Sequence, residues 1–508
     1  VEGRFEKIGK IKNNSKVILD YAHTPDALKI LLLNIRKQFP SKKISLVFGC
    51  GGDRDKKKRS KMGKIASKYS DIIYLTDDNP RSEKPNKIRN EIKSGIKNKK
   101  FIEIPNRKDA ISKCIQDLNT GDIAIVAGKG HEKTQDYDGN KNYFSDRDEI
   151  LRFIKNKNKS LHADLRLNIL EEISSNLLPK DIIFKQACIN SREVKKNDIF
   201  FAIKGNKNDG NKFILDAKKK GSSLAIVNRL DHRISKLNQI KVENTQKFLS
   251  KCASIYRDNL RSNIIGITGS CGKTTLKEML ANTLKKISKV SYSPNSFNNK
   301  YGLPLSLFNL VRNDDFGVFE VGMDKKGEID YLTKILKPDL GIITNISYAH
   351  SKNFKTIDKI AEAKSEIIEN IKSNGTLILN ADDNFFNFHR QKALKNKIKV
   401  LSFSITKRSA TIKLIKIKKR KNIYQIFLRY NNLVLSFYIK KDSENFIQNL
   451  LASLLALSNY FDITVLSKKI FLDFEIPQGR GDVSKIKIKN KIINLVDESY
   501  NSNPLSLK

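Results

Sequence analysis

The stretch from residue 263 to 279 constrains the fold of this chain more than any other. A short apolar run breaks into small residues, and Lys273 with two threonines then opens an amphipathic helix. A strand, a small-residue loop and a helix in this order form a site whose backbone N–H groups can surround a triphosphate at the positive end of the helix. We expect the amides of residues 269–272 to wrap the phosphates, Lys273 to reach the outer phosphates and Thr274 to bind Mg²⁺. The common pattern has glycine where Ile267 stands. Strand and helix are nevertheless both present, which favours an ATP site over a glycine-rich turn with an exposed lysine.

Length and composition describe a protein of several globular domains. The chain has 508 residues, and one domain usually takes about 150 residues. An apolar share of 39% with mixed charges is typical of folded rather than disordered protein. No apolar run approaches the roughly 18 residues of a membrane span, and the start has no signal-peptide pattern. The five cysteines are scattered without metal-type spacing. We therefore expect a cytoplasmic protein with reduced thiols and no membrane insertion.

The formal net charge of +43 raises the question of a nucleic-acid partner. Lysine is spread over nearly every segment, however, and no single basic stripe carries interleaved aromatic residues. The composition favours a solvated, lysine-rich surface and no nucleic acid as partner, which leaves a DNA-dependent ATPase as a distant alternative. Such a surface would still attract polyanionic nucleotides.

One passage occurs twice at a very long interval. Gly3 and Arg4 are followed by a lysine-rich stretch and a strand that ends at Asp20, and Gly479 and Arg480 are followed in the same way by Asp497. The glycines lie 476 positions apart and the aspartates 477, which is far too long for a solenoid repeat. The repeat predicts two related multidomain enzymes joined head to tail and cut at the same structural point. We therefore expect this chain to be an internal fragment of a longer polypeptide, and natural start and stop codons at its ends would contradict this.

Residues 1–155 alternate between strand and helix patterns. The predicted strands are 16–20, 43–49, 71–76 and 122–127, and the predicted helices are 25–37, 59–69, 85–97 and 107–117. This order predicts a Rossmann-like, doubly wound parallel sheet, in which ligands gather at the carboxyl ends of the strands. Four polar runs follow the four strands: DYAH at 20–23, GCGGDRD at 49–55, DDNPR at 77–81 and GKGHE at 128–132. Four such runs at one edge of a sheet predict a binding site.

The remaining residues divide into a linker and three further α/β parts. The lysine- and asparagine-rich residues 156–160 are typical of a linker. We expect a small α/β domain at 161–262, the ATP-binding domain at 263–478 and the start of another domain at 479–508. Residues 411–440 alternate like an antiparallel ribbon at the edge of the ATP-binding domain.

These motifs resemble those of the Mur ligases, which build the peptide of bacterial cell-wall precursors. Residues 1–155 resemble the C-terminal domain of the MurE type, which adds the third amino acid, in DYAHTP at 20–25, GGDRD at 51–55, DNPR at 78–81 and GKGHE at 128–132. Residues 161–508 resemble the MurF type, which adds D-alanyl-D-alanine. The matching runs there are SR at 191–192, TGSCGKT at 268–274, NN at 298–299, EVG at 320–322, AK at 363–364, NAD at 380–382 and the stretch 497–504.

The resemblance implies a three-domain architecture with a small UDP-binding domain, a central P-loop ATPase domain and a C-terminal domain. It also implies an ATP-dependent ligase of peptidoglycan synthesis, and thereby a role in cell shape and division. In such a ligase ATP converts a carboxylate into an acyl phosphate, which an amine then attacks. Both steps concentrate negative charge, so Lys273 and Mg²⁺ are expected to carry most of the stabilisation.

The resemblance also assigns residues of the MurF-like part. The catalytic set is Lys273, Glu320, His350 and Lys364, and the metal set is Thr274, Glu320, His350 and Lys364 as a carbamate. The ATP set is Gly269, Ser270, Cys271, Gly272, Lys273, Thr274, Thr275, Asn380, Asp382, Arg480 and Asp497. The set for the UDP-N-acetylmuramoyl peptide is Ser191, Arg192, Asn298 and Asn299. From the residues alone, His350 would be a turn histidine and Lys364 a helix-surface lysine between acids.

In the MurE-like part the resemblance implies a site for the incoming amino acid. Its residues are Arg54, Asp78, Asn79, Arg81, Gly128 and Glu132. The forked guanidinium of Arg81 can hold a distal carboxylate at two points, which favours meso-diaminopimelate over L-lysine. Lys57 and Ser60 stand where the family usually has glycine and proline, which leaves the shape of the preceding loop open.

We expect a ligase that adds D-alanyl-D-alanine to a UDP-N-acetylmuramoyl tripeptide and is fused to part of the diaminopimelate-adding ligase. The first alternative is a catalytically inactive fragment that binds nucleotide only. The second is a permuted enzyme whose first domain substitutes for a missing last one, but residues 497–504 would then be redundant.

Overall fold

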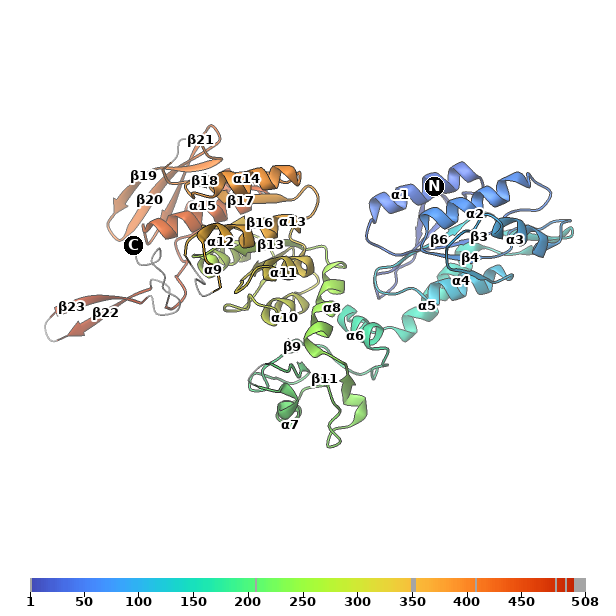
Figure 1. Cartoon of the computed structure of the whole chain (residues 1–508), viewed down its shortest axis with the longest axis horizontal. Helices are drawn as coiled ribbons and strands as arrows, with labels where there is room; N and C mark the ends of the chain where they lie inside the picture. The colour runs from blue at the N-terminus through green and yellow to red at the C-terminus, as the bar shows by residue number, and fades with distance from the viewer. Residues whose placement is uncertain are drawn as a thin grey trace. The chain divides into compact units, whose positions relative to one another are not determined.

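The computed structural model describes residues 2–205, 208–348, 353–406, 409–479, 482–488 and 491–497. The chain divides into two compact units, Val1–Phe184 and Lys185–Lys508. Each unit is an α/β structure of its own (Figure 1). The finer predicted limits, at 155, 160, 262 and 478, stay predictions.

The first unit is built on a six-stranded sheet in the order β1-β2-β6-β3-β4-β5. The strands from β2 to β5 run parallel, and β1 adds an antiparallel edge. Their bounds are β1 Glu6–Ile8, β2 Lys16–Asp20, β3 Ile44–Phe48, β4 Ile72–Leu75, β5 Phe101–Glu103 and β6 Ile123–Ala127. Strands β3 and β6 are buried along their whole length, which explains their uninterrupted apolar sequences.

Helices cover both faces of this sheet. Apolar residues of α1 (Pro25–Gln38), α2 (Lys57–Tyr69) and α3 (Pro85–Lys93) pack on one face, and those of α4 (Arg107–Gln116) and α5 (Asp146–Ser160) pack on the other. The side chains of a strand alternate between the two cores, so that Ile18 belongs to the first core and Val17 to the second. The four predicted strands and four predicted helices are confirmed, with shifts at their ends.

Several elements of the first unit escaped prediction. Strands β1 and β5 are only three residues long, and the hairpin of β7 (Thr134–Tyr137) and β8 (Asn140–Tyr143) is largely polar. Residues 156–160, predicted as a linker, form the last turn of α5. Ile150 and Ile154 of α5 are buried, so one apolar stripe is enough to dock a helix that is otherwise lysine-rich. Helix α6 (Leu165–Ser174) follows it.

The second unit begins with a parallel sheet of four short strands in the order β12-β11-β10-β9. These strands and their neighbouring helices are β9 Ala187–Cys188, β10 Ile199–Phe201, η1 Gly210–Phe213, α7 Ile214–Lys219, β11 Leu224–Val227, η2 Lys236–Asn238 and β12 Gln239–Lys241. Helix α8 (Thr245–Arg257) then leads into the larger sheet.

That larger sheet has nine strands in the order β14-β15-β13-β16-β17-β18-β19-β20-β21. The seven strands from β14 to β19 in this order run parallel. Strand β20 pairs antiparallel with both β19 and β21, which confirms the ribbon predicted at 411–440. The bounds are β13 Asn263–Thr268, β14 Val290–Tyr292, β15 Phe316–Glu320, β16 Leu340–Ile343, β17 Thr376–Asn380, β18 Lys399–Ser404, β19 Ile412–Arg420, β20 Ile423–Tyr430 and β21 Leu433–Ile439.

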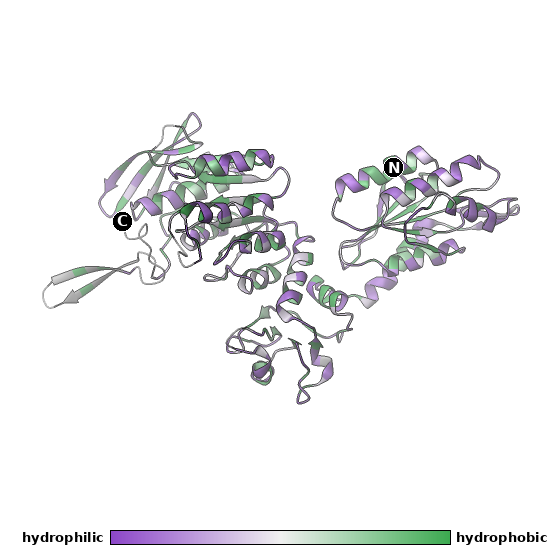
Figure 2. Ribbon diagram, viewed as in Figure 1, coloured by the Kyte–Doolittle hydropathy of each residue, from purple (hydrophilic) through white to green (hydrophobic). Residues whose placement is uncertain are grey.

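The helices of the second unit bury the apolar strands of this sheet, which Figure 2 shows in green. They are α9 Lys273–Lys285, α10 Gly302–Phe308, α11 Glu328–Leu336, α12 Ile357–Lys364, α13 Glu366–Glu369, α14 Phe386–Lys395, α15 Glu444–Ser458 and η3 Ile463–Val465. Helices α9 and α15 share one core with the strands. A separate antiparallel hairpin, β22 (Asp482–Ile488) and β23 (Lys491–Asp497), follows. None of the helices in the described ranges is long and apolar enough to cross a membrane.

Candidate functional site

The loop between β13 and α9 has a backbone that only glycine fits easily. Gly269 has a φ of +144°, and a Cβ atom there would lie 1.9 Å from Thr344 Oγ1. The Thr344 hydroxyl donates a hydrogen bond to the Cys271 carbonyl oxygen at 2.6 Å. Gly272 has a φ of +79° and forms the N-cap of α9. The loop therefore has a tight, glycine-dependent backbone, and Thr344, which directly follows β16, holds its curvature.

The loop amides differ from the expectation that residues 269–272 all face the phosphates. The N–H groups of Ser270 and Cys271 donate to the carbonyl and side-chain oxygens of Asn345, both at 2.9 Å. The first hydrogen bond inside α9 runs from Leu276 N–H to Gly272 O at 2.8 Å. The N–H groups of the first helical turn have no acceptor within the helix, as at any helix start, and are the natural anion donors. In this structure the N–H groups of Ser270 and Cys271 are thus bonded to Asn345, and the assignment of residues 269–272 to the phosphates stays a prediction.

Two lysines converge on one carbonyl oxygen of the loop. Lys273 Nζ and Lys364 Nζ both lie 2.8 Å from Gly269 O. Lys364 closes helix α12 and is buried, not on a helix surface. Its burial, together with the neighbouring charge of Lys273, holds the pKa of Lys364 well below its usual range. These surroundings favour the uncharged form of the Lys364 amine over the charged form.

Glu320, at the end of β15, joins the loop to a second predicted group. Its Oε2 accepts a hydrogen bond from Thr274 Oγ1 at 2.6 Å, and its Oε1 accepts one from Asn298 Nδ2 at 2.7 Å. A hydroxyl and a carboxylate side by side are ligands that suit Mg²⁺, which usually takes one or two carboxylates together with phosphate oxygens. No group of three or more His, Cys, Asp or Glu side chains forms a metal cluster within the described ranges.

Lys277 was not predicted, yet it organises this corner. Its side chain is fully buried and donates to the carbonyl oxygens of Ser293 and Asn295, which holds the loop that carries Asn298. The sequence signal was a lysine one turn after Lys273, between the apolar Leu276 and Leu280. The Oδ1 atom of the neighbouring Asn299 accepts the N–H groups of Tyr301 and Gly302 at the start of α10, both at 3.0 Å, and its contact with substrate stays a prediction.

The residues predicted at the adenine and ribose are only partly described. The Asp382 carboxylate accepts Ser404 Oγ at 2.7 Å, Thr406 Oγ1 at 2.6 Å and Ile405 N–H at 2.6 Å, and so holds the turn after β18. Asn380 Oδ1 accepts the N–H group of Asp382 at 3.0 Å. Asp497 is the last residue of β23. His350 and Arg480 lie outside the described residues.

The predicted UDP-side residues Ser191 and Arg192 lie in the turn after β9. Ser191 is buried and Arg192 is exposed, with its carbonyl oxygen accepting Lys220 Nζ at 2.7 Å. The small sheet is tied to α10 because Asn309, which caps that helix, exchanges two hydrogen bonds with the backbone of Ala187 at 2.6 and 2.8 Å. Helix α10 therefore links the small sheet to the segment that carries Asn298.

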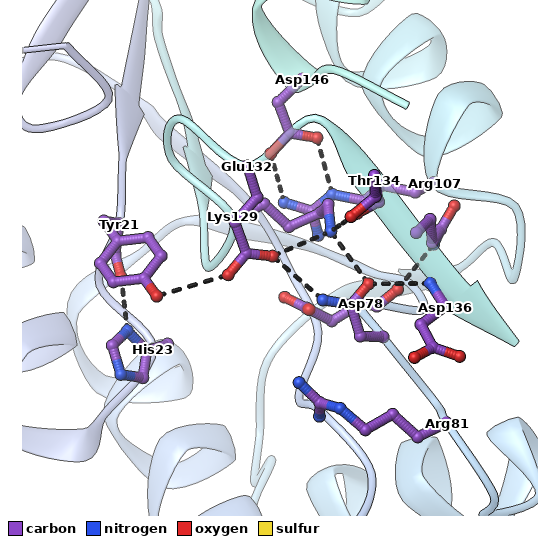
Figure 3. A network of polar contacts seen from close by, with 12 residues as sticks. Tyr21, His23, Asp78, Arg81, Arg107, Lys129, Glu132, Thr134, Asp136 and Asp146 are labelled. Atoms are coloured by element: carbon purple, nitrogen blue, oxygen red, sulfur yellow. Dashed lines mark hydrogen bonds and ion pairs between the residues drawn. The ribbon is translucent and has the colours of Figure 1, made fainter. Parts of the chain in front are cut away.

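In the first unit the loops after β4 and β6 meet as predicted, around a residue that was not predicted (Figure 3). Lys129 is fully buried, and its Nζ donates to Asn79 Oδ1 at 3.0 Å, Glu132 Oε2 at 3.2 Å and Thr134 O at 2.6 Å. Asn79 Nδ2 also donates to Glu132 Oε2 at 3.0 Å. A Cβ atom on Gly128 would lie 2.6 Å from Asp78 Oδ2. Four of the six predicted residues are thus in one cluster.

The two predicted arginines, Arg54 and Arg81, are not among the residues that accept a hydrogen bond from Lys129. Arg81 has a φ of +52°, and its Nη1 donates to the Gly52 carbonyl oxygen at 2.7 Å. Arg54 is exposed. The two loops that carry them, after β3 and after β4, are joined by Arg59, a buried residue that escaped prediction. Arg59 donates to Gly51 O at 3.1 Å and to both carboxylate oxygens of Glu83 at 2.8 and 3.0 Å. These hydrogen bonds lower the pKa of Glu83 to about 2.

A second unpredicted pair lies beside the cluster (Figure 3). Arg107 and Asp146 are both fully buried and form two hydrogen bonds of 2.7 and 2.8 Å. Arg107 Nη2 also donates to the Ala127 carbonyl oxygen at 3.0 Å. Asp146 is the first residue of α5, so the pair joins the first turns of α4 and α5 to the end of β6.

Lys57, where the family usually has glycine, is the first residue of α2, and its N–H group donates to Asp55 Oδ1 at 2.9 Å.

Comparison with known proteins gives three family matches in consecutive stretches. Residues 3–130 match the Mur ligase glutamate ligase domain, 184–257 match the Mur ligase family catalytic domain, and 267–457 match the Mur ligase middle domain. The first of these stretches contains Asn79 and Lys129 but ends before Glu132 and Thr134, and the last contains the loop between β13 and α9.

Two curated relatives match different shares of the chain. A UDP-N-acetylmuramoyl-tripeptide–D-alanyl-D-alanine ligase of Rickettsia prowazekii is 35% identical over 341 residues, which are 66% of this chain and 73% of the relative. A UDP-N-acetylmuramoyl-L-alanyl-D-glutamate–2,6-diaminopimelate ligase of Rickettsia rickettsii is 48% identical over 156 residues, which are 30% of this chain and only 32% of the relative.

Two solved structures are similar to most of the chain. MurF from Acinetobacter baumannii superposes with a TM-score of 0.59 at 26% identity, over 67% of this chain and 74% of that one. MurF ligase from Thermotoga maritima in complex with ADP gives a TM-score of 0.55 at 28% identity, over 65% of this chain and 74% of that one.

Proposed function

The chain belongs to the Mur ligase family of ATP-dependent amide ligases, and on this premise we propose that its second unit serves the addition of D-alanyl-D-alanine to a UDP-N-acetylmuramoyl tripeptide. The observation that carries the proposal is the meeting of Lys273, Lys364 and Gly269 O beside the Thr274–Glu320 pair. It is a site for concentrated negative charge at the start of a helix.

The proposed reaction has two steps whose charges this site suits. A carboxylate oxygen of the tripeptide attacks the γ-phosphorus of ATP, the bond to ADP breaks, and an acyl phosphate forms. The amine of D-alanyl-D-alanine then attacks the acyl carbon, loses a proton, and phosphate leaves. Lys273 and the N–H groups of the first turn of α9 stabilise the phosphate charge in the first step.

Magnesium would be held by Thr274 and Glu320, with His350 as a further ligand by family resemblance. When bound, the ion neutralises charge on the phosphate oxygens. Lys364 is proposed to carry a carbamate, formed when its amine adds to CO₂ and releases a proton. Support for this comes from the burial of Lys364 and its lowered pKa, since only the neutral amine can attack CO₂.

Phosphate release tests the proposed activity against the alternative of a fragment that only binds nucleotide. With ATP and Mg²⁺, release should require both UDP-N-acetylmuramoyl tripeptide and D-alanyl-D-alanine, and each single omission is the control. Nucleotide binding without any release would favour the binding-only alternative. Release that depends on DNA would contradict both proposals.

For the first unit we propose a site for meso-diaminopimelate. Asp78 offers a carboxylate that could take up an ammonium group, and Arg81 has further N–H groups besides the one donated to Gly52 O. The ammonium and carboxylate groups of one amino-acid centre fit such a pair. meso-Diaminopimelate has two such centres, whereas the side-chain end of L-lysine has an ammonium group without a carboxylate. The chain should therefore bind meso-diaminopimelate in preference to L-lysine, and Arg81→Met should remove at least about tenfold of that preference. Equal affinity of the unaltered chain for both amino acids would contradict the site.

We further propose that this chain places parts of two consecutive ligases on one polypeptide. Support comes from the order of the family matches, in which the glutamate ligase domain precedes the catalytic and middle domains. Antibodies against residues 1–155 and against 263–478 should recognise one common band in a cell extract. Two separate bands would contradict the fusion.

A further inference from the structure

Lys129 occupies the centre of the polar cluster in the first unit. Its side chain has no exposed surface, and an ammonium group has three N–H donors and no acceptor. All three donors are matched by acceptors, namely Asn79 Oδ1, Glu132 Oε2 and Thr134 O. A buried charge is tolerated only with such compensation. The contacts of Lys129 therefore determine how the groups around it are oriented.

The first consequence concerns the side-chain amide of Asn79. Its Oδ1 accepts from Lys129 Nζ at 3.0 Å and from the Asp136 N–H group at 3.1 Å. Two donors on the same side require the oxygen there, so the Nδ2 group must face Glu132. Reversing the amide would place an NH₂ group against an ammonium.

The second consequence concerns the two carboxylate oxygens of Glu132. Oε2 accepts from both Lys129 and Asn79, at 3.2 and 3.0 Å. Among the described residues, Oε1 accepts a single, longer bond from the Tyr21 hydroxyl, at 3.3 Å. The Glu132 side chain is 34% exposed, so one oxygen is held inside the cluster and the other has room for a ligand. Figure 3 shows Tyr21 and Lys129 on opposite sides of this carboxylate.

We propose that Lys129 is a positioning residue for amino-acid recognition. It fixes Asn79 and Glu132 so that Glu132 Oε1, together with the Tyr21 hydroxyl, receives an ammonium group of the ligand. This inference rests on the proposed amino-acid site of the first unit and adds the residue through which that site is organised.

The test compares affinities of the full chain for meso-diaminopimelate by NMR titration. Lys129→Met should weaken binding at least about tenfold, because Glu132 loses a charged partner and is free to turn away. Glu132→Gln should have a similar effect. Since the two residues act as one unit, the double variant should be within about twofold of the weaker single variant.

Arg36→Met is the matched control. Arg36 also donates to three groups, Lys42 O, Tyr69 O and Asp71 Oδ2 at 2.9, 3.4 and 2.8 Å, but near the amino ends of β3 and β4. Its loss should leave the affinity within about twofold of the unaltered chain, because additivity holds for distant sites. If Lys129→Met fails to fold, Lys129→Gln keeps two N–H donors without the charge and should show the same loss.

The outcomes separate the inference from the proposed function. If Arg81→Met weakens binding but Lys129→Met and Lys129→Gln do not, the role of Lys129 is overturned and the site stands. Fully additive effects of Lys129→Met and Glu132→Gln overturn it as well. If the unaltered chain does not bind the ligand, the site itself is overturned, and a crystal structure of Lys129→Met still decides the orientation. An unchanged Asn79–Glu132 contact there would rule out the role of Lys129.

Discussion

Lys273→Ala should weaken the binding of Mg·ATP by the chain by at least about 100-fold. A hydrogen bond to a charged group contributes about 1.5–3 kcal/mol, and the Lys273 ammonium should make more than one of them once the phosphates replace its present acceptors, Gly269 O and Ser270 O. Titration calorimetry with a non-hydrolysable ATP analogue measures this directly.

The matched control for this prediction is Lys285→Ala. Lys285 lies in the last turn of the same helix, where its Nζ reaches the Tyr292 hydroxyl at 3.1 Å. Its replacement should change nucleotide affinity by less than about twofold, since it carries the same charge far from the helix start. Equal losses for the two variants would mean that general charge, and not the phosphate loop, attracts the nucleotide.

Lys364→Met should remove a carbamate from the chain. It should also lower the phosphate-release rate by about 100-fold, which is the usual effect of losing one group that stabilises charge in the transition state. The measurement is a ¹³C NMR carbamate signal after incubation with ¹³C-bicarbonate. An ordinary lysine has a pKa of about 10.4 and stays protonated at neutral pH. Burial and Lys273 lower the pKa of Lys364, so its amine can react there.

The pH dependence of that signal has a definite sign. As the pH falls toward the lowered pKa of Lys364, the amine takes up a proton and the carbamate should be lost while the fold persists. Lys359→Met is the control, because Lys359 is exposed on the same helix and pairs with Glu362 at 3.0 Å. A carbamate signal that survives in Lys364→Met, or one that Lys359→Met abolishes, would place the modification elsewhere.

The predictions from sequence succeeded where a pattern is local. Apolar runs bounded by polar turns located β2, β3, β4, β6 and β13, and the small residues before Lys273 located the loop between β13 and α9. The helical structure of residues 156–160 escaped prediction for a local reason. Lysines and asparagines there outnumber the few apolar residues that dock α5, and the role of this segment as a linker stays a prediction. The ends of parallel strands meet at one edge of a sheet, so the clustering of Asn79 and Glu132 could be expected without coordinates.

Side-chain partners far apart in the chain could not be expected in the same way. Lys364 and Gly269 are 95 residues apart, and Lys129 and Asn79 are 50 apart. Sequence periodicity reports which residues face a core, since backbone geometry repeats every two or 3.6 residues. It carries no information on which buried charge meets which acceptor. The amino-acid order alone thus accounts for the longer apolar elements, the loop before Lys273 and the family. The pairing of Asn345 with the loop amides, the burial of Lys364 and the contacts of Lys129 arise only when distant segments pack, because each buried polar group must then find its partner among whatever the fold brings near.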